Sequence, residues 1–367
     1  MSKSKNANGI VRALVLAAGL LGLLMGTSRA EDIKVKVLMP AKIVNEAFSP
    51  FSVAKYMGYF KDEGLDVDLV AVGGSNEVAL AVSSGSGDVG LASPGQALAG
   101  MQAPQALNLK YFFEANYRSI WTVTVKPDSP FKSVKDLKGK KIGIAAMGSA
   151  ATNFGKALAS EAGLNPATDV TFIAVGSGAQ AVGALNNDAV DALIFSSQET
   201  TKFEANGFKI RYLDIGEGFA SLPDVGLLAR RETVADKAKM LTGIARAVAK
   251  GYVFSVANPA AAVKISWKLF PEAEPKNISP EQALKGGIMV NEKRMEIWSS
   301  PKTKGVIGLF VDEDWKRLVD YMKTNGILKE DIPLDRIYTN ALIPEINNFD
   351  KDKIRAQAKA FDIATMK

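Results

Sequence analysis

A loop of small residues, 146–149, offers the clearest ligand-binding chemistry in this sequence. It follows an apolar run at 141–145 that is typical of a strand, and apolar residues then recur at helical spacing. The loop therefore brings Gly148, Ser149 and Ala150 to a helix N-terminus. Free backbone N–H groups and the positive end of the helix dipole can hold a small anion or a polar ligand oxygen there. The alternative is that Ser149 only caps its helix.

Several other loops have the same form, in which glycine, serine or proline follows a strand and opens a helix. Loops of this kind from both halves of the chain can converge on one ligand. The residues that we expect to contact the ligand are Phe48, Ser49, Ser75, Ser93, Arg118, Gly148, Ser149, Ala150, Ser177 and Gln198. Arg118 suits a sulfonate or carboxylate, whereas Phe48, Tyr117 and Trp121 suit a planar ring. The residue types leave both kinds of ligand open.

Catalysis has few candidate residues. The chain contains no histidine and no cysteine, which excludes Ser-His-Asp and Cys-His nucleophiles and zinc sites built from imidazole or thiolate. A pair of carboxylates could act as acid and base, but aspartate and glutamate gather in surface-like runs such as 312–314. We therefore expect no catalytic residue, no metal site and no cofactor.

Two glycine patterns bear on nucleotide binding. The match at 85–90 follows a helix and precedes a strand, which is the reverse of the order that a dinucleotide fingerprint requires. The match at 176–181 lies between a strand and a helix, and Glu199 ends the next strand, where an acid could bind a ribose. A nucleotide stays open at this second loop. The alternative is a second ligand-facing loop without a nucleotide.

Strands and helices alternate around these loops. Period-two and short apolar runs predict strands at residues 33–39, 65–71, 88–92, 109–114, 121–125, 141–145, 170–175 and 189–195. From residue 233 onward the pattern is helical. This order predicts an α/β fold with mostly parallel sheets flanked by helices, in which ligands bind beyond the carboxyl ends of the strands.

The first thirty residues have the composition of a cleavable signal peptide. A basic start precedes an apolar run at 13–25 that is too short to span a bilayer, and residues 28–30 fit the small-x-small cleavage pattern. Removing residues 1–30, which carry four basic and no acidic side chains, lowers the formal charge from +6 to +2. We expect a periplasmic protein without a lipid anchor; a retained membrane anchor is the alternative. The remaining charge does not indicate nucleic-acid binding.

The remaining 337 residues suggest two lobes, each with its own core. We place one lobe at residues 31–125 and 226–367, including a helical C-terminal tail that returns to it, and the other at residues 126–225. The chain would then cross twice between the lobes, near 121–126 and 225–230, and these crossings would form a hinge.

Four motifs resemble a known family: AKYMGYFKDEGLDV at 54–67, GSGDVGLA at 85–92, DLKGKKIG at 136–143 and YTN at 338–340. They are similar to those of the periplasmic binding proteins of ABC importers for aliphatic sulfonates, taurine, nitrate and the thiamine pyrimidine precursor. The resemblance covers most of the chain after residue 30. It implies a type II periplasmic binding protein fold, with two α/β lobes that close on a solute between them.

The resemblance also implies transport. One branch, the eukaryotic pyrimidine synthase, is an enzyme that consumes its own histidine and carries a cysteine-rich motif, and this chain has neither residue. The implied partners are a small organic anion and an inner-membrane ABC permease, with the protein acting as a monomer and binding no nucleic acid. An aromatic or pyrimidine-type solute in the same fold is one alternative. An exported enzyme and a sensory protein that presents ligand to a membrane receptor are the others.

The export signal generates a first prediction. Protein recovered from the periplasm should begin at Glu31, because the small residue Ala30 precedes the expected cleavage point. N-terminal sequencing measures this directly. Recovery of the chain from the membrane fraction with residues 1–30 intact would contradict it.

Overall fold

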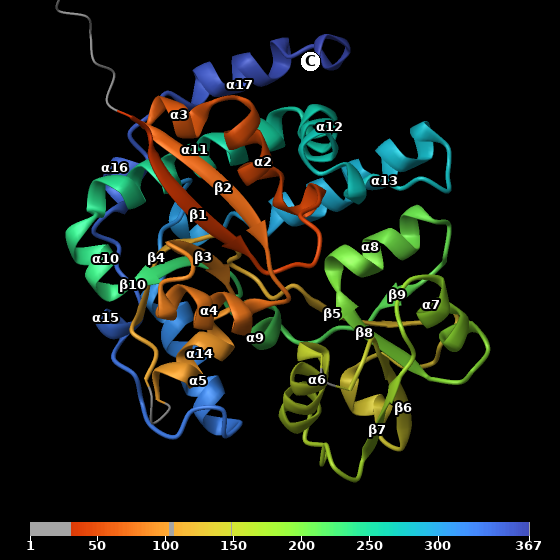
Figure 1. Cartoon of the computed structure of the whole chain (residues 1–367). Coiled ribbons are helices and arrows are strands. Elements are labelled where there is room, and N and C mark those ends of the chain that lie inside the picture. Colours follow the sequence, from red (N-terminus) through yellow and green to blue (C-terminus); the bar gives the residue numbers. More distant parts are fainter. Residues whose placement is uncertain (1–30, 103–105, 148, 367) are drawn as a thin grey trace, which may run out of the picture. The chain divides into compact units, whose positions relative to one another are not determined.

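Two five-stranded sheets flanked by helices make up the fold (Figure 1). The computed structural model describes residues 31–102, 106–147 and 149–366. From Lys34 onward the described chain forms one compact unit. The predicted signal peptide at 1–30 and the predicted ligand contact Gly148 lie outside the described residues.

The strands are β1 (Ile33–Met39), β2 (Leu65–Ala71), β3 (Val89–Ala92), β4 (Leu109–Glu114), β5 (Trp121–Val125), β6 (Lys140–Ile144), β7 (Val170–Ala174), β8 (Ala192–Ser196), β9 (Arg211–Tyr212) and β10 (Gly226–Arg230). Eight of the strands occur at the positions that the apolar patterns predict, within a few residues, whereas β9 was not predicted and β10 lies where only a crossing was predicted.

Helices fill most of the remaining described chain. The α-helices are α2 (Ser49–Tyr56), α3 (Tyr59–Asp62), α4 (Ser75–Ser84), α5 (Pro94–Met101), α6 (Ala150–Glu161), α7 (Ala179–Asn186), α8 (Ser197–Ala205), α9 (Glu217–Ala220), α10 (Arg231–Asp236), α11 (Ala238–Ala257), α12 (Pro259–Leu269), α13 (Pro280–Glu296), α14 (Asp312–Thr324), α15 (Leu334–Ile337), α16 (Ile343–Ile346) and α17 (Lys351–Ala360). The short 3₁₀ helices are η1 (Glu46–Phe48), η2 (Val134–Leu137), η3 (Pro271–Ala273), η4 (Pro301–Thr303) and η5 (Ile363–Thr365). Among the described residues, none of these helices is both long and apolar enough to cross a membrane.

The first sheet has the strand order β2-β1-β3-β10-β4 and separates two cores. Side chains of β1 alternate between them: Val35 and Val37 face the core formed with α2 and α11, whereas Leu38 faces the core formed with α4 and α5. β1 and β3 pair in parallel, while β10 runs antiparallel to both β3 and β4. The predicted alternation of strands and helices therefore builds a sheet that is covered on both faces.

The second sheet has the order β7-β6-β8-β5-β9. β6 pairs in parallel with β7 and β8, and β5 pairs antiparallel with β8 and β9. The strand that follows each crossing of the chain, β5 or β10, runs antiparallel to its neighbours, so both sheets are mixed. The predicted boundary at residue 125 comes after β5, whereas β5 pairs within the second sheet. The predicted two-lobed α/β fold is confirmed.

Two segments outside the strands, residues 115–120 and 220–225, connect the sheets and lie side by side; we call them the linkers. The N–H groups of Ala115 and Asn116 both donate to the Val225 carbonyl at 2.9 Å. The Ser119 N–H donates to the Ala220 carbonyl at 3.0 Å. The linkers are thus hydrogen-bonded to each other along their length.

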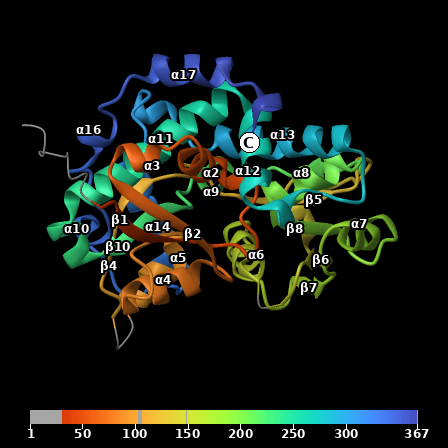
Figure 2. The ribbon, with the colours of Figure 1, turned by 45° about the horizontal axis from the view of Figure 1, so that its top comes forward.

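The helical tail packs on more than the first sheet. α11 and α12 pack against α2, as expected from the sequence, but α13 also lies beside α8 of the second sheet (Figures 1 and 2). Gly286 permits this approach, because a Cβ there would lie 3.2 Å from the Ala205 Cβ. Nearby, Lys202 pairs with the buried carboxylate of Glu46 at 3.7 Å. The tail was expected to wrap back onto the first lobe, and α13 also contacts α8 beside the second sheet.

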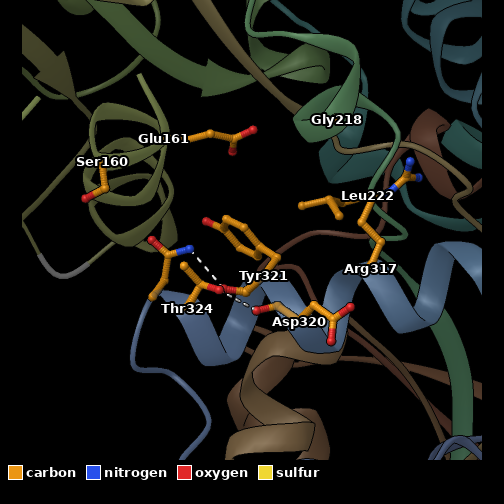
Figure 3. A pocket seen from close by; sticks show the side chains of 9 residues that line it. Ser160, Glu161, Gly218, Leu222, Arg317, Asp320, Tyr321 and Thr324 are labelled. Carbon is orange, nitrogen blue, oxygen red and sulfur yellow. Dashed lines mark hydrogen bonds between the residues drawn. The ribbon is translucent and has the colours of Figure 1, made fainter. Parts of the chain in front are cut away.

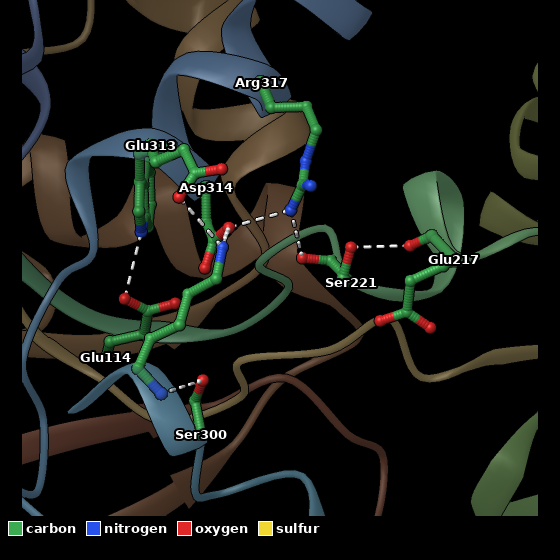
Figure 4. A network of polar contacts seen from close by, with 9 residues as sticks. Glu114, Glu217, Ser221, Ser300, Glu313, Asp314 and Arg317 are labelled. Carbon is green, nitrogen blue, oxygen red and sulfur yellow. Dashed lines mark hydrogen bonds and ion pairs between the residues drawn. The ribbon is translucent and has the colours of Figure 1, made fainter. Parts of the chain in front are cut away.

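α14 anchors both linkers through a polar network (Figure 4). The Trp315 Nε1–H donates to Glu114 Oε2 at 3.1 Å, directly before the first linker. Arg317 donates to the Ser221 carbonyl of the second linker at 3.2 Å and to Asp314 Oδ1 at 2.8 Å. Glu114 is buried, and its Oε1 has no hydrogen-bond partner among the described residues. Burial, followed by the nearby charge of Asp314, raises the pKa of Glu114 well above its ordinary value.

The contact between α2 and α11 generates a second prediction. In Gly251→Ala, the new Cβ would collide with the backbone of Pro50, so the helices must separate, at a cost of about 1–3 kcal/mol of unfolding free energy. Gly183→Ala is the matched control, since a Cβ at that position in α7 meets nothing within 4 Å. The control should gain about 0.5–1 kcal/mol from helix propensity. Urea unfolding measures both, and equal stability changes would contradict this packing.

Glu114 generates a third prediction. Its folded pKa is raised, so the folded state keeps a proton that the unfolded state releases, and stability falls as pH rises from the ordinary carboxyl pKa of about 4.3 toward the raised value. Glu114→Gln keeps an acceptor for Trp315 and cannot ionise. The unfolding free energy of the variant should therefore equal that of the natural protein near pH 4 and exceed it at pH 7. Unfolding curves across this range give the answer, and parallel pH profiles for the two proteins would contradict it.

Candidate functional site

A cavity of about 360 Å³, which we call the inner cavity, lies beyond the carboxyl ends of β1, β2 and β3. The linkers, the end of β8 and the C-terminal end of α13 complete its wall. Its lining residues are Pro40, Ala41, Ala47, Phe48, Gly73, Gly74, Ser75, Leu91, Ser93, Ala115, Asn116, Ile120, Trp121, Ser196, Gln198, Val225, Arg294 and Trp298. This is the position at which an open α/β sheet binds its ligand.

Arg294 is the buried cation of the inner cavity. Its side chain is 7% exposed, and one terminal nitrogen donates to Gln198 Oε1 at 3.3 Å. The Nε–H has no hydrogen-bond partner among the described residues. Burial lowers the pKa of Arg294, while the more distant Asp224 acts in the opposite direction. A guanidinium stays charged in proteins, so this side chain carries a desolvated positive charge with unused donor capacity.

The sequence of α13 explains why an arginine lies in a core. Its buried stripe contains Gly287, Val290, Asn291 and Arg294, spaced at three and four residues, and Trp298 continues it just past the helix. Asn291 fastens this face to the start of α2, because its side-chain N–H group donates to Ser49 Oγ at 2.5 Å. Our sequence analysis missed Arg294. The available signal was an asparagine and an arginine at core positions of a helix that is otherwise amphipathic.

Asp224 organises the other polar side of the inner cavity. The Ser93 hydroxyl donates to its Oδ1 at 2.6 Å, and the Ile120 N–H donates to its Oδ2 at 3.0 Å. The Ser75 hydroxyl in turn accepts from the Ser93 N–H at 3.0 Å. Burial raises the pKa of Asp224, and the hydrogen bonds and Arg294 oppose that effect. The hydrogen bonds of the Asp224 carboxylate therefore connect β3 to both linkers. Its negative charge is partly desolvated.

Aromatic rings form much of the remaining wall. Phe48, Trp121 and Trp298 all line the inner cavity. Trp298 is held in place by Tyr252, whose ring stacks on it at 5.6 Å with an interplanar angle of 16°. A polar head group at Arg294 would therefore lie among surfaces that suit a flat or apolar ligand.

A second cavity of about 730 Å³, the outer cavity, adjoins the first. The two share Gly73, Gly74, Ser75, Ser93 and Trp121. Ser149 lines the outer cavity; its side chain makes no cap hydrogen bond to α6, and its buried hydroxyl has no partner among the described residues. In the structure Ser149 is thus available to a ligand and is not a side-chain cap.

The structure brings together part of the predicted contact set. Phe48, Ser75, Ser93 and Gln198 line the inner cavity, and Ser149 lines the outer one. Ala150 begins α6, and Ser49 is buried against Asn291, where it supports the site without lining it.

Two of the predicted contacts lie away from both cavities. Arg118 points to the surface and pairs with the exposed Glu217 at 3.2 Å. Ser177 is exposed in the loop before α7. The sequence places both residues in loops but does not determine which way a linker or loop side chain points.

The loop before α7 does not offer a free phosphate site. Glu199 Oε1 accepts from the Gly178 N–H at 3.0 Å, so a carboxylate of the protein itself occupies the N-terminus of α7. Among the described residues, no group of three or more His, Cys, Asp or Glu side chains is arranged to hold a metal ion.

Comparison with known proteins agrees with this geometry. The riboflavin-binding protein RibY of Chloroflexus aurantiacus is 24% identical over 315 residues, which cover 82% of this chain and 84% of that protein. The aliphatic sulphonate binding protein SsuA of Escherichia coli has a TM-score of 0.60 at 15% identity, covering 83% of this chain and 91% of SsuA. The desulfurization enzyme DszB has a TM-score of 0.54 at 12% identity, covering 86% of this chain and 99% of DszB. At these identities the solved structures establish a shared fold.

A family-level match covers much of the sequence. The family described as NMT1/THI5 like matches residues 45–262, which include β2 to β10, both linkers and most of the residues that line the inner cavity. This span is more than half of the chain. The protein therefore belongs to the NMT1/THI5-like family, which confirms the resemblance inferred from its sequence motifs.

Proposed function

We propose that this protein is the periplasmic solute-binding component of an ABC importer and captures an organic anion in the cleft that contains the inner cavity. Its family membership and fold support a binding role. The names of two relatives, an aliphatic sulphonate binding protein and a riboflavin-binding protein, support an organic solute. An inner-membrane permease is the partner that this role requires, and we propose that the protein meets it as a monomer.

The observation that carries the proposal is the buried guanidinium of Arg294. A buried charge that forms no direct ion pair costs free energy. A bound ligand of opposite charge would offset that cost, which is a reason for a binding protein to keep such a charge in its cleft. Gln198 supplies a neutral acceptor at 3.3 Å, while Nε is left without a partner among the described residues. A sulfonate or carboxylate has the oxygens to bridge these nitrogens, and it would displace no carboxylate of the protein from them.

We propose that the two sheets with their helices act as lobes that move about the linkers. Residues on both sides of the inner cavity would then share the ligand: Ser75 and Ser93 from the first sheet, and Gln198 from α8. The contact between α8 and α13 must loosen for the solute to enter, because Arg294 and Gln198 meet across it.

We propose binding without turnover. DszB shows that an enzyme can share this fold, so the fold alone does not decide between the two functions. The chain lacks histidine and cysteine entirely, and two buried carboxylates beside lining residues of the inner cavity are engaged: Asp224 by Ser93 and Ile120, and Glu46 by Trp267 and Lys202. These hydrogen bonds and ion pairs suit a structural role better than acid–base catalysis.

An aromatic or pyrimidine-type solute is the second candidate. The rings of Phe48, Trp121 and Trp298 in the cavity wall favour it, and the name of the relative RibY agrees with a flat ligand. Such a solute would present a carbonyl or a ring acid to Arg294 in place of a sulfonate.

The role of Arg294 generates a fourth prediction. Arg294→Met fills a similar volume without charge, so it should weaken the binding of ethanesulfonate and naphthalene-2-sulfonate by about 1.5–3 kcal/mol, or roughly ten- to a hundredfold in Kd. The substitution removes a desolvated cation but also takes a nearby positive charge from the buried Asp224 carboxylate, so thermal unfolding of the unliganded variant establishes that it still folds. Titration calorimetry measures the loss of affinity.

Arg118→Ala is the matched control, because it removes an exposed arginine outside both cavities. Its affinity for both sulfonates should equal that of the natural protein. The proposal fails if Arg294→Met binds as the natural protein does, or if Arg118→Ala causes the loss instead.

A further inference from the structure

Four aromatic rings form a continuous row along the outer cavity. Trp121 lies 5.8 Å from Phe154, Phe154 lies 4.7 Å from Phe219, and Phe219 lies 5.1 Å from Tyr321, measured between ring centroids. The last two pairs meet edge to face, at 89° and 77°. These rings come from β5, α6, α9 and α14, so one strand and three helices that are far apart in the sequence contribute to one wall.

Aliphatic side chains extend this row, while polar residues that include Glu77, Asn153 and Asp224 line other parts of the outer cavity. The aliphatic side chains are those of Leu222, Leu318, Met322 and Ile327, and Ile327 is 39% exposed. A short aliphatic acid at Arg294 would leave the 730 Å³ of the outer cavity without an apolar occupant. A fused ring system that continues past Trp121 would cover this surface and meet the ring edges and faces that it presents.

A third cavity of about 520 Å³ continues beyond Tyr321 and Leu222, both of which also line the outer cavity (Figure 3). Glu161 reaches from α6 into the space above Tyr321. The other charged lining residues are balanced: Arg317 pairs with Asp314 at 2.8 Å, and Asp320 pairs with Lys316 at 2.9 Å. Glu161 has no ion-pair partner among the described residues, and partial burial raises its pKa. A second negative charge on the ligand would meet this carboxylate.

We propose that the solute is an aromatic monoanion, with its acid group at Arg294, its ring system along the row from Trp121 to Tyr321, and an end without negative charge facing Glu161. This inference rests on the proposed function, since it assigns the ligand class of the same cleft. Arg294 in the inner cavity binds the acid group, and the outer cavity binds the ring system. Glu161 disfavours a ligand with a second acid group.

Three probes separate these contributions: ethanesulfonate, naphthalene-2-sulfonate and naphthalene-2,6-disulfonate. Titration calorimetry with the full processed chain should show naphthalene-2-sulfonate binding at least about tenfold tighter than ethanesulfonate, from ring burial and aromatic pairing. The disulfonate should bind more weakly than the monosulfonate, because its second sulfonate approaches Glu161. Phe219→Leu should reduce the advantage of the naphthalene ring and leave the Kd of ethanesulfonate unchanged.

Glu161→Gln should bring the Kd values of the mono- and disulfonate closer together, and Glu281→Gln, at an exposed position on α13, is the matched control that should not. Equal affinities for ethanesulfonate and naphthalene-2-sulfonate, both dependent on Arg294, would overturn this inference and leave the proposed function standing. An unchanged ratio in Glu161→Gln would overturn the assignment of the distal end. Failure of all three probes to bind would overturn both proposals.

Discussion

A positive charge buried at Arg294, which forms no direct ion pair among the described residues, is the constraint on which this site depends. The charge lies at the end of a helix that packs on both sheets, and its hydrogen-bond acceptor among the described residues is an amide oxygen of α8. Desolvation makes a buried positive charge unfavourable, and an anion that binds beside it offsets this cost. The unliganded cleft therefore favours an anionic ligand. The aromatic rings around it supply shape and apolar surface, and they decide which anion fits.

The rest of the fold holds this charge at the meeting point of the two lobes. Asn291 binds α13 to the start of α2, and Gly286 brings the same helix against α8. On the opposite side, Asp224 joins β3 to both linkers, and α14 fixes the linkers from outside through Trp315 and Arg317. A ligand that binds Arg294 therefore contacts the tail, the second sheet and the linkers together, which are the elements that a hinge motion would rearrange.

Sequence patterns predicted the parts of this structure that local chemistry determines. Period-two alternation located β1 and β2, and strand-to-loop junctions located Ser75, Ser93 and Gln198 at the cleft. Arg294 lies about a hundred residues after Gln198, and the pairing of the two depends on how α13 packs, which no local pattern encodes. Arg118 was placed near the cleft by its position in a linker, but the direction of its side chain depends on the exposed partner Glu217.

The central claim is that Arg294 holds the acid group of the solute, and a crystal structure of the complex with naphthalene-2-sulfonate tests it most directly. The account predicts sulfonate oxygens about 2.7–2.9 Å from the Arg294 guanidinium, with Nε now donating, and the naphthalene ring beside Trp121. A sulfonate bound at Arg118 or at the Ser149 loop, with Arg294 Nε still lacking a partner, would contradict it.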